Sequence, residues 1–228
     1  MRFRSYILLA AIPTFAALAG CGTSGVYAPY AMTRVGGARA MDAGSAAAVA
    51  GVQALETKLQ TFTGTIAFWE TDGKDVSTNT CKIAFAMPEK IRADFTQSSD
   101  SMRDGASMVY LGGATIEAKK WFVHKTYKVT DPAACSLRGY RIDQTDIKFM
   151  LGTITNPQDT VVAGPAPNVY EVSGPGLLPQ TTREEVALDP TTFVPQTINF
   201  FNGNDSVYRI KLTGVKINPS LPGDTFQL

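Results

Sequence analysis

Side chains that could carry acid–base or nucleophilic catalysis are few in this sequence. The single histidine, His124, stands between Val123 and Lys125 on a predicted strand, where it could act as a general base. No Gly-x-Ser-x-Gly motif supplies a nucleophile, and no glycine-rich loop is available to cradle a phosphate. The adjacent Glu184 and Glu185 alternate between the two faces of a predicted strand, so they would not act as a pair. The sequence therefore does not predict an enzyme.

The first residues are typical of an export signal. Arg2 and Arg4 precede an apolar run from Tyr6 to Leu18, about 13 residues long. A helix that crosses a membrane needs about 20 such residues, so the run predicts a cleaved signal peptide rather than a permanent span. The sequence Leu-Ala-Gly-Cys that ends at Cys21 resembles the lipobox of bacterial lipoproteins at all four positions. This resemblance implies cleavage before Cys21 and a diacylglyceryl group on its sulfur.

The lipobox resemblance also implies a membrane address. Two acyl chains anchor a protein stably, and Gly22 lacks the acidic side chain that retains enterobacterial lipoproteins at the inner membrane. We therefore expect attachment to the periplasmic face of the outer membrane. The predicted organisation is a signal peptide (residues 1–20), a lipidated tether rich in Gly, Ala, Ser and Thr (residues 21–41) and one domain (residues 42–228).

Composition and the remaining cysteines narrow the chemistry further. Without residues 1–20 the chain has 19 basic and 20 acidic residues, a net charge of about −1, which gives no reason to expect nucleic acid as a partner. Cys81 and Cys135 form an even pair in an exported protein, which favours a disulfide; two unpaired buried cysteines are the alternative. Together with His124 they form no metal-ligand spacing, so we expect neither a metal nor a cofactor.

The elements that must position these residues are one helix and many strands. Apolar residues at three- and four-residue intervals predict a helix from about Ala46 to Gln60, with Asp42 and Ser45 available to cap it. Period-two alternation then predicts antiparallel strands within residues 62–69, 81–87, 91–96, 107–111, 120–129, 160–163, 169–173, 183–188, 196–201 and 206–212. A short second helix is predicted at residues 142–151. About ten twisted strands must curl, because twist accumulates across a sheet.

The predicted fold class is therefore α+β. We expect an incomplete antiparallel β-barrel, a strongly curled sheet of about ten strands, with the N-terminal helix and the short inserted helix over its concave face. The helix cannot bury its apolar stripe alone, so it must pack on the sheet. If the barrel is incompletely closed, apolar strand faces and helices enclose a cleft rather than a filled core.

Several segments resemble one protein family. The helix, Thr-Phe-Thr-Gly at residues 61–64 and Ala-Met-Pro-Glu-Lys-Ile-Arg at residues 86–92 are similar to the start of the periplasmic lipoprotein carrier and outer-membrane lipoprotein receptor superfamily (LolA/LolB-like), whose fold mycobacterial lipid-carrying lipoproteins such as LppX share. Residues 188–203 resemble the penultimate hairpin of that family, and residues 214–228 its closing segment. The resemblance covers most of residues 46–228 and implies a lipid-binding rather than a catalytic protein.

The resemblance assigns two further residues. An arginine of the family maps onto Arg92, where it would contact the helix that covers the cavity; a solvated strand arginine is the alternative. Receptor-type members carry an exposed apolar residue in the loop between their third and fourth strands. Here that loop spans about residues 98–106, and Met102 is its large apolar residue, a candidate for insertion into a membrane.

The implied function is capture of acyl chains of lipids or lipoproteins in a hydrophobic cleft, for transport or outer-membrane insertion. Such binding needs apolar area, about 0.8 kcal/mol per buried CH₂, and few directed hydrogen bonds. A periplasmic carrier could deliver the lipid or acylated lipoprotein. The alternative is a structural or interaction lipoprotein of the cell envelope with the same scaffold and a filled core. The candidate lining residues are aromatic or branched: Phe62, Ile66, Phe68, Ile83, Phe85, Ile91, Phe95, Tyr110, Phe149, Ile198, Phe200 and Ile210.

Overall fold

The computed structural model describes residues 41–144 and 146–228. The expected signal peptide, Cys21 and nearly all of the expected tether lie outside these residues. The described chain begins with helix α1 (Ala43–Lys58). Asp42 caps it, because its two carboxylate oxygens accept hydrogen bonds from the Ser45 amide (2.9 Å) and the Ser45 hydroxyl (2.7 Å). The predicted helix is thus confirmed, with its start a few residues earlier than expected.

The rest of the described chain is dominated by one antiparallel sheet of eleven strands, in the order β6-β5-β4-β3-β2-β1-β11-β10-β9-β8-β7. Two runs of consecutive neighbours, β1 to β6 and β7 to β11, are joined where β1 pairs with β11. Strands β6 and β7 are the two edges, so the sheet is not closed. The strands are β1 (Thr61–Thr71), β2 (Val76–Ala86), β3 (Lys90–Ser98), β4 (Ser107–Tyr110), β5 (Thr115–Lys120), β6 (Val123–Lys128), β7 (Thr160–Ala163), β8 (Val169–Ser173), β9 (Arg183–Leu188), β10 (Pro195–Asn202) and β11 (Asp205–Ile217).

The register of the sheet gathers the alternating apolar residues on one face. Cys81 lies opposite Phe95, Ile83 opposite Ala93, and Phe85 opposite Ile91 on β2 and β3. Their neighbours β1 and β11 continue the same row, because Ile66 pairs with both Cys81 and Leu212. This inner face is buried in the main hydrophobic core. The antiparallel strands with one apolar and one wetter face are therefore confirmed.

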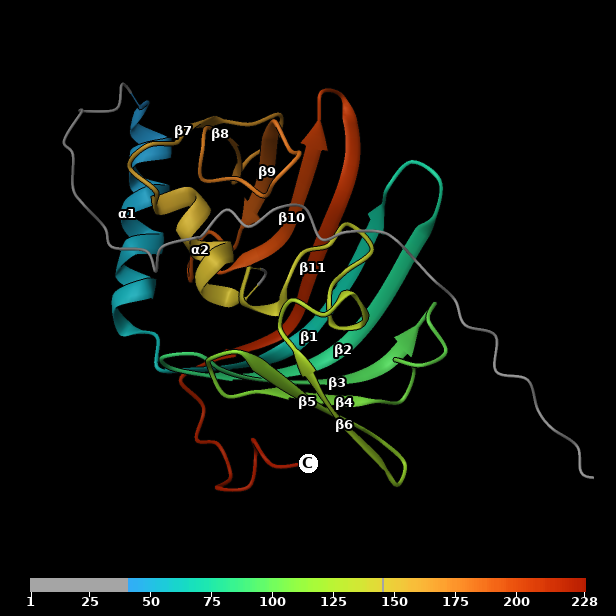
Figure 1. Cartoon of the computed structure of the whole chain (residues 1–228). Helices are drawn as coiled ribbons and strands as arrows, with labels where there is room; N and C mark the ends of the chain where they lie inside the picture. Colours follow the sequence, from blue (N-terminus) through green and yellow to red (C-terminus); the bar gives the residue numbers. More distant parts are fainter. Residues whose placement is uncertain (1–40, 145) are drawn as a thin grey trace, which may run out of the picture. The chain divides into compact units, whose positions relative to one another are not determined.

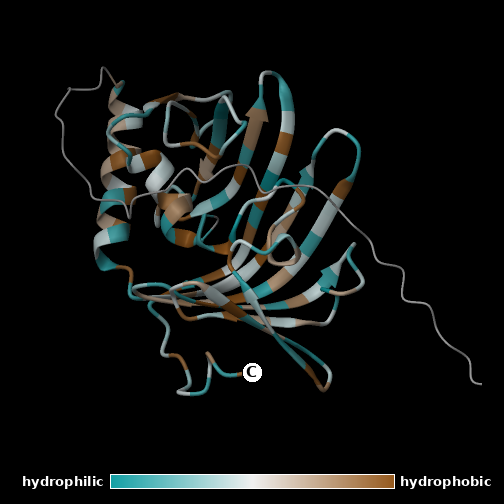
Figure 2. Cartoon of the chain, viewed as in Figure 1, coloured by the Kyte–Doolittle hydropathy of each residue, from teal (hydrophilic) through white to brown (hydrophobic). Residues whose placement is uncertain are grey.

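The sheet curls, and the helices lie within its curve (Figure 1). Helix α2 (Ile147–Thr155) packs on α1 and reaches β10, where the rings of Phe149 and Phe200 stack at 6.3 Å. Before α2, the chain crosses the inner side of the sheet as a segment with two short 3₁₀ turns, η1 (Pro132–Ala134) and η2 (Ile142–Gln144). We call residues 131–144 the strap. In Figure 2, apolar residues, coloured brown, recur along the strands and on helix α2. The expected incomplete barrel with helices on its concave face is confirmed.

Two expected elements differ from the structure. The strand expected at residues 120–129 is a hairpin, with β5 and β6 joined at Trp121 and Phe122. Neither residue is a usual turn former, and Trp121 adopts a left-handed backbone with φ of 54°, which sequence patterns do not predict for a tryptophan. The inserted helix starts later than expected, after Asp146, whose side chain accepts a hydrogen bond from the Phe149 amide at 2.8 Å. No helix in the described part of the chain is long and apolar enough to cross a bilayer.

Candidate functional site

A cavity of about 120 Å³ lies between the strap and the inner face of β1 to β4. Helix α2 packs on β10 and contacts β9 in the other half of the concave face. Over β1 to β4, the strap spans the sheet and leaves this cavity beneath it. The wall is mostly apolar. It is formed by Ile66, Phe68, Glu70, Asn79, Cys81, Ile83, Phe85, Ile91, Ala93, Phe95, Arg103, Met108, Ala134, Ser136, Tyr140, Ile142, Asp146, Ile147 and Tyr208.

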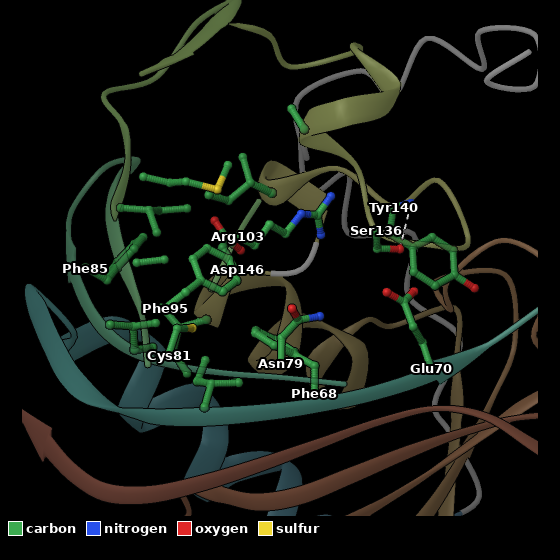
Figure 3. A pocket seen from close by; sticks show the side chains of 18 of the residues that line it. Phe68, Glu70, Asn79, Cys81, Phe85, Phe95, Arg103, Ser136, Tyr140 and Asp146 are labelled. Carbon is green, nitrogen blue, oxygen red and sulfur yellow. Dashed lines mark hydrogen bonds between the residues drawn. The ribbon is translucent and has the colours of Figure 1, made fainter. Parts of the chain in front are cut away.

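The cavity has an apolar end and a more polar end. In Figure 3, Phe85, Phe95 and Cys81 lie together on one side, whereas Glu70, Ser136 and Tyr140 lie on the other. For scale, an engineered apolar cavity of about 150 Å³ in another protein holds benzene. The present volume therefore accepts a ring or a few methylene groups.

Half of the twelve expected lining residues face this cavity. These six lie on three adjacent strands, β1 to β3, and are Ile66, Phe68, Ile83, Phe85, Ile91 and Phe95. The other six are buried elsewhere in the core and do not line the cavity: Phe62, Tyr110, Phe149, Ile198, Phe200 and Ile210. The alternation of the strands places eleven of the twelve on the inner face, and Phe149 lies on helix α2. It does not show that α2 covers Phe200 and leaves the space over Ile83 open.

The strap is held to the sheet partly by Arg103, which comes from the loop between β3 and β4. Its Nη2 donates hydrogen bonds to the carbonyl oxygens of Ala133 (3.2 Å) and Cys135 (2.5 Å). Its Nε lies 3.5 Å from the carboxylate of Asp100, which keeps the guanidinium charge paired. Bonds to a charged donor are among the stronger hydrogen bonds. Arg103 therefore fixes the start of the strap.

Glu70 holds the middle of the strap from beneath. This carboxylate is buried on β1 and accepts hydrogen bonds from the amides of Leu137 (2.9 Å) and Arg138 (3.2 Å). Arg138 in turn donates to the Thr71 carbonyl at 2.7 Å, and the Tyr140 hydroxyl donates to the Pro179 carbonyl at 2.9 Å. A buried acid needs such donors. The sequence alone could have predicted that Glu70 points inward, since it follows the apolar Ile66 and Phe68 at two-residue spacing on β1.

The expectation that Arg92 contacts a covering helix is wrong in this structure. Arg92 alternates with Ile91 and Ala93 and therefore points to the outer face of the sheet. There it pairs with Asp94 at 2.9 Å and donates to the carbonyl oxygens of Thr225 (3.1 Å) and Gln227 (2.8 Å) in the C-terminal segment. Arg103, eleven positions later in the sequence, makes the contacts to the covering segment.

The expected disulfide is not formed. Cys81 and Cys135 are both buried thiols that are not joined to each other. Cys81 lies on β2 in the cavity wall, whereas Cys135 belongs to the strap, where its Sγ lies 3.7 Å from the Val129 carbonyl oxygen as a hydrogen-bond donor. Burial raises the pKa of Cys81 to about 12, with a smaller contribution from Asp94, so this thiol stays protonated at neutral pH.

Two acids, the half-buried Asp146 and the buried Glu184, have raised pKa values. Burial raises the pKa of Asp146, at the start of α2 and in the cavity wall, to about 6. Burial also raises the pKa of Glu184 on β9 to about 8, and the nearby Asp159 adds to this effect. The Glu184 carboxyl accepts one hydrogen bond, from the Thr153 hydroxyl of α2 at 2.8 Å. Both side chains therefore keep their protons to a higher pH than an ordinary acid does.

The remaining candidates lie away from the cavity. His124 is exposed on β6, opposite Lys119. Glu184 and Glu185 occupy opposite faces of β9, as their alternation predicts: Glu184 is buried, and Glu185 contacts Arg183 on the wetter face. Met102 is exposed in the β3–β4 loop, with 65% of its surface accessible. Within residues 41–144 and 146–228, no group of three or more His, Cys, Asp or Glu side chains could hold a metal ion.

Comparison with known proteins yields matches in structure but not in sequence. No protein-family model and no curated protein matches the chain. Among solved structures it is similar to an uncharacterized conserved protein from Thermus thermophilus (9% identity, 80% of this chain and 93% of that one, TM-score 0.49). It is also similar to lipoprotein LppX from Mycobacterium tuberculosis (9% identity, 78% of this chain and 97% of that one, TM-score 0.44). A third similar structure is a LolA superfamily protein from Nitrosomonas europaea (9% identity, 82% of this chain and 99% of that one, TM-score 0.40).

One of these solved structures is described as a LolA superfamily protein. The likeness is one of fold, at identities near one residue in ten. The function proposed below therefore rests on the cavity and the strap of this chain.

Proposed function

We propose that the protein binds an acyl chain of a lipid or lipoprotein between the strap and β1 to β4, while anchored through Cys21 at the periplasmic face of the outer membrane. The supporting observation is a mostly apolar cavity beneath the strap, which hydrogen bonds from Arg103 and to Glu70 attach to the sheet. Its wall of Ile, Phe and Met side chains matches the need of a hydrocarbon chain for apolar area without directed hydrogen bonds.

The volume of the cavity sets a condition on this function. Pockets for drug-sized ligands are usually about 300–1,000 Å³, and this cavity measures about 120 Å³. A full acyl chain therefore requires the strap to move outward. This movement would break the clasp, which consists of the hydrogen bonds from Arg103 and to Glu70. It would also separate Tyr140 of the strap from Tyr208 of β11, whose ring centroids lie 5.5 Å apart.

Filling the cavity tests the proposal. Ala93 on β3 lines the cavity, so Ala93→Leu would place its added methyl groups in that space. We expect the affinity for a fluorescent acyl probe to fall about tenfold or more, because the space for the first methylene groups is lost. The matched control is Ala67→Leu on β1, the same change at a position that alternates with the inward Ile66 and Phe68.

The measurement uses chain that begins after Cys21, purified from the periplasm without detergent. Both helices and all eleven strands lie within residues 43–217, so this chain retains the described fold. Native mass spectrometry and lipid extraction would identify co-purified acyl compounds, and probe titration would give affinities. Equal binding by the Ala93→Leu and Ala67→Leu proteins would overturn the assignment of this cavity.

The small volume also favours one alternative, an interaction lipoprotein of the cell envelope with an almost filled core. It predicts a protein that carries no lipid and takes up no acyl probe, even after the strap is loosened by Arg103→Ala. The same titration therefore separates the two functions.

A further inference from the structure

The turn between β5 and β6 carries the most exposed large apolar side chains of the described chain. Phe122 and Trp121 are 90% and 77% exposed, and Val123 beside them is 43% exposed. The hairpin extends beyond the neighbouring strands (Figure 1), and its end is coloured as apolar in Figure 2. We call residues 121–123 the aromatic tip. Nothing in the described part of the fold buries it.

Folding alone does not account for these residues. A two-residue hairpin turn favours Asn or Gly, because its residues adopt left-handed backbone conformations. Trp121 adopts such a conformation, with φ of 54°, although a bulky side chain disfavours it. Asn or Gly at this position would suit the turn better and would remove exposed apolar area. The aromatic tip therefore carries a cost in the isolated domain that an external partner would offset.

The charges around the aromatic tip identify the chemistry of that partner. The hairpin from residue 115 to residue 128 contains four lysines and one glutamate. Lys120 places its ammonium 5.0 Å from the centre of the Trp121 ring and donates a hydrogen bond to the Ser101 carbonyl at 2.6 Å. That contact also brings the β3–β4 loop, which carries the exposed Met102, next to the hairpin. Aromatic residues flanked by lysines are typical of segments at the interface of a bilayer.

We propose that the aromatic tip inserts into the interface of an anionic lipid bilayer. The rings of Trp121 and Phe122 occupy the headgroup level, and the lysines of the hairpin contact acidic headgroups. A folded protein partner would instead need a broad complementary surface, whereas the tip is narrow. This inference does not depend on what the cavity holds. It gives the domain a membrane contact of its own, separate from any lipid at Cys21.

The test is vesicle binding by the chain that begins after Cys21, in a Trp69→Phe background that leaves Trp121 as the only tryptophan. The vesicles contain equal parts of phosphatidylglycerol and phosphatidylcholine. We expect the Trp121 emission to shift to shorter wavelength on binding. Binding should weaken with salt and in pure phosphatidylcholine, by about fivefold for each lysine that contacts the surface.

Variants locate the contact. In the parent sequence, Trp121→Ser with Phe122→Ser should lower partitioning, measured by vesicle sedimentation, about tenfold or more. The control is Leu111→Ser, which removes a 55% exposed apolar residue at the β4–β5 turn, the opposite end of the same strands. Met102→Ser shows whether the β3–β4 loop contributes to the contact.

Loss of binding by the serine pair with binding retained by Leu111→Ser supports the proposal. Absence of a Trp121 shift, or equal partitioning by the serine pair and the parent, overturns it. Acyl-probe uptake is measured on the same proteins and should be unchanged by the serine pair. Acyl-probe uptake thus tests the cavity, and vesicle binding tests the aromatic tip, so either proposal can fail without the other.

Discussion

Two buried glutamates on the inner face of the sheet show how partners decide the state of an acid. Glu70 receives two backbone amides from the strap, whereas Glu184 receives one hydroxyl, from Thr153. The Oε2 atom of Glu184 has no hydrogen-bond partner in the described part of the chain. A buried carboxylate with too few hydrogen-bond donors destabilises the fold, which favours the neutral acid. Burial accordingly raises the pKa of Glu184 to about 8.

Glu184 makes stability depend on pH. The unfolded chain releases this proton near the ordinary pKa of 4.5, and the folded chain retains it to about pH 8, so stability falls as pH rises between these values. Asp146, with a pKa of about 6, acts in the same direction. The free energy of unfolding should therefore fall between pH 5 and pH 9 in the parent. We expect this fall to be smaller in Glu184→Gln, by roughly 2–4 kcal/mol.

Urea unfolding at several pH values measures this difference. Glu185→Gln is the control, because Glu185 lies on the outer face and contacts Arg183. Parallel pH profiles for the parent and Glu184→Gln would show that Glu184 ionises normally in the folded protein.

The two buried cysteines give a second prediction at the scale of the residue. Burial raises the pKa of Cys81 and thereby suppresses its reactive thiolate. We expect iodoacetamide to modify neither Cys81 nor Cys135 in the native protein at pH 8, and to modify both after unfolding without reductant. Mass spectrometry counts the added groups. An unfolded protein that takes up none until it is reduced would demonstrate a disulfide.

At the scale of the element, the strap is held to the sheet in part by side-chain hydrogen bonds that single substitutions remove. The clasp from Arg103 joins the β3–β4 loop to Ala133 and Cys135. We expect Arg103→Ala to speed hydrogen exchange of the Leu137 and Arg138 amides about tenfold or more, because two charge-assisted hydrogen bonds are lost.

Arg92→Ala is the matched control for this exchange experiment. Arg92 lies on the strand that precedes the loop carrying Arg103, but it contacts the C-terminal segment on the outer face. Exchange in the strap should be unchanged in that variant. Equal protection of the strap in the parent and in Arg103→Ala would show that the clasp does not limit opening.

The strands that form the cavity wall could be predicted, and the strap could not. Alternation alone places Ile83, Phe85, Ile91 and Phe95 inward and Arg92 outward. The clasp joins Arg103 to a carbonyl 32 positions away, and Glu70 to an amide 67 positions away. No local pattern encodes such separations. The aromatic tip was also missed, because Trp, Phe and Val together resemble the interior of a strand.

At the scale of the molecule, the sheet consists of two runs that meet where β1 pairs with β11. Residues that pair there, such as Phe68 and Ile210, are more than a hundred positions apart in the sequence. Because α1 and α2 also pack over the second run, the two runs share one core. We therefore expect the described domain to unfold in one cooperative step.

Ile210→Ala tests this cooperativity. Ile210 is fully buried on β11 between Phe68 of β1 and Ile198 of β10, so its truncation should cost about 2–5 kcal/mol. Circular dichroism and the fluorescence of Trp69 should report the same lowered midpoint. Val162→Ala at the exposed edge strand β7 should change stability by about 0.5 kcal/mol or less. Separate transitions for the two probes would show that the runs unfold independently.

The hydrogen bonds that hold the strap, those of the clasp and those from Arg138 and Tyr140, have a consequence for evolution. Arg103, Glu70, Arg138 and Tyr140 all bind main-chain atoms: carbonyl oxygens of Ala133, Cys135, Thr71 and Pro179, and amides of Leu137 and Arg138. Most of these partners offer the same atoms whatever their side chains are. Substitutions at positions such as Ala134 and Ile142, which face the cavity, could therefore accumulate while closure persists. Descendants of this chain could therefore change the ligand of the cavity while they keep the hydrogen bonds that hold the strap over it.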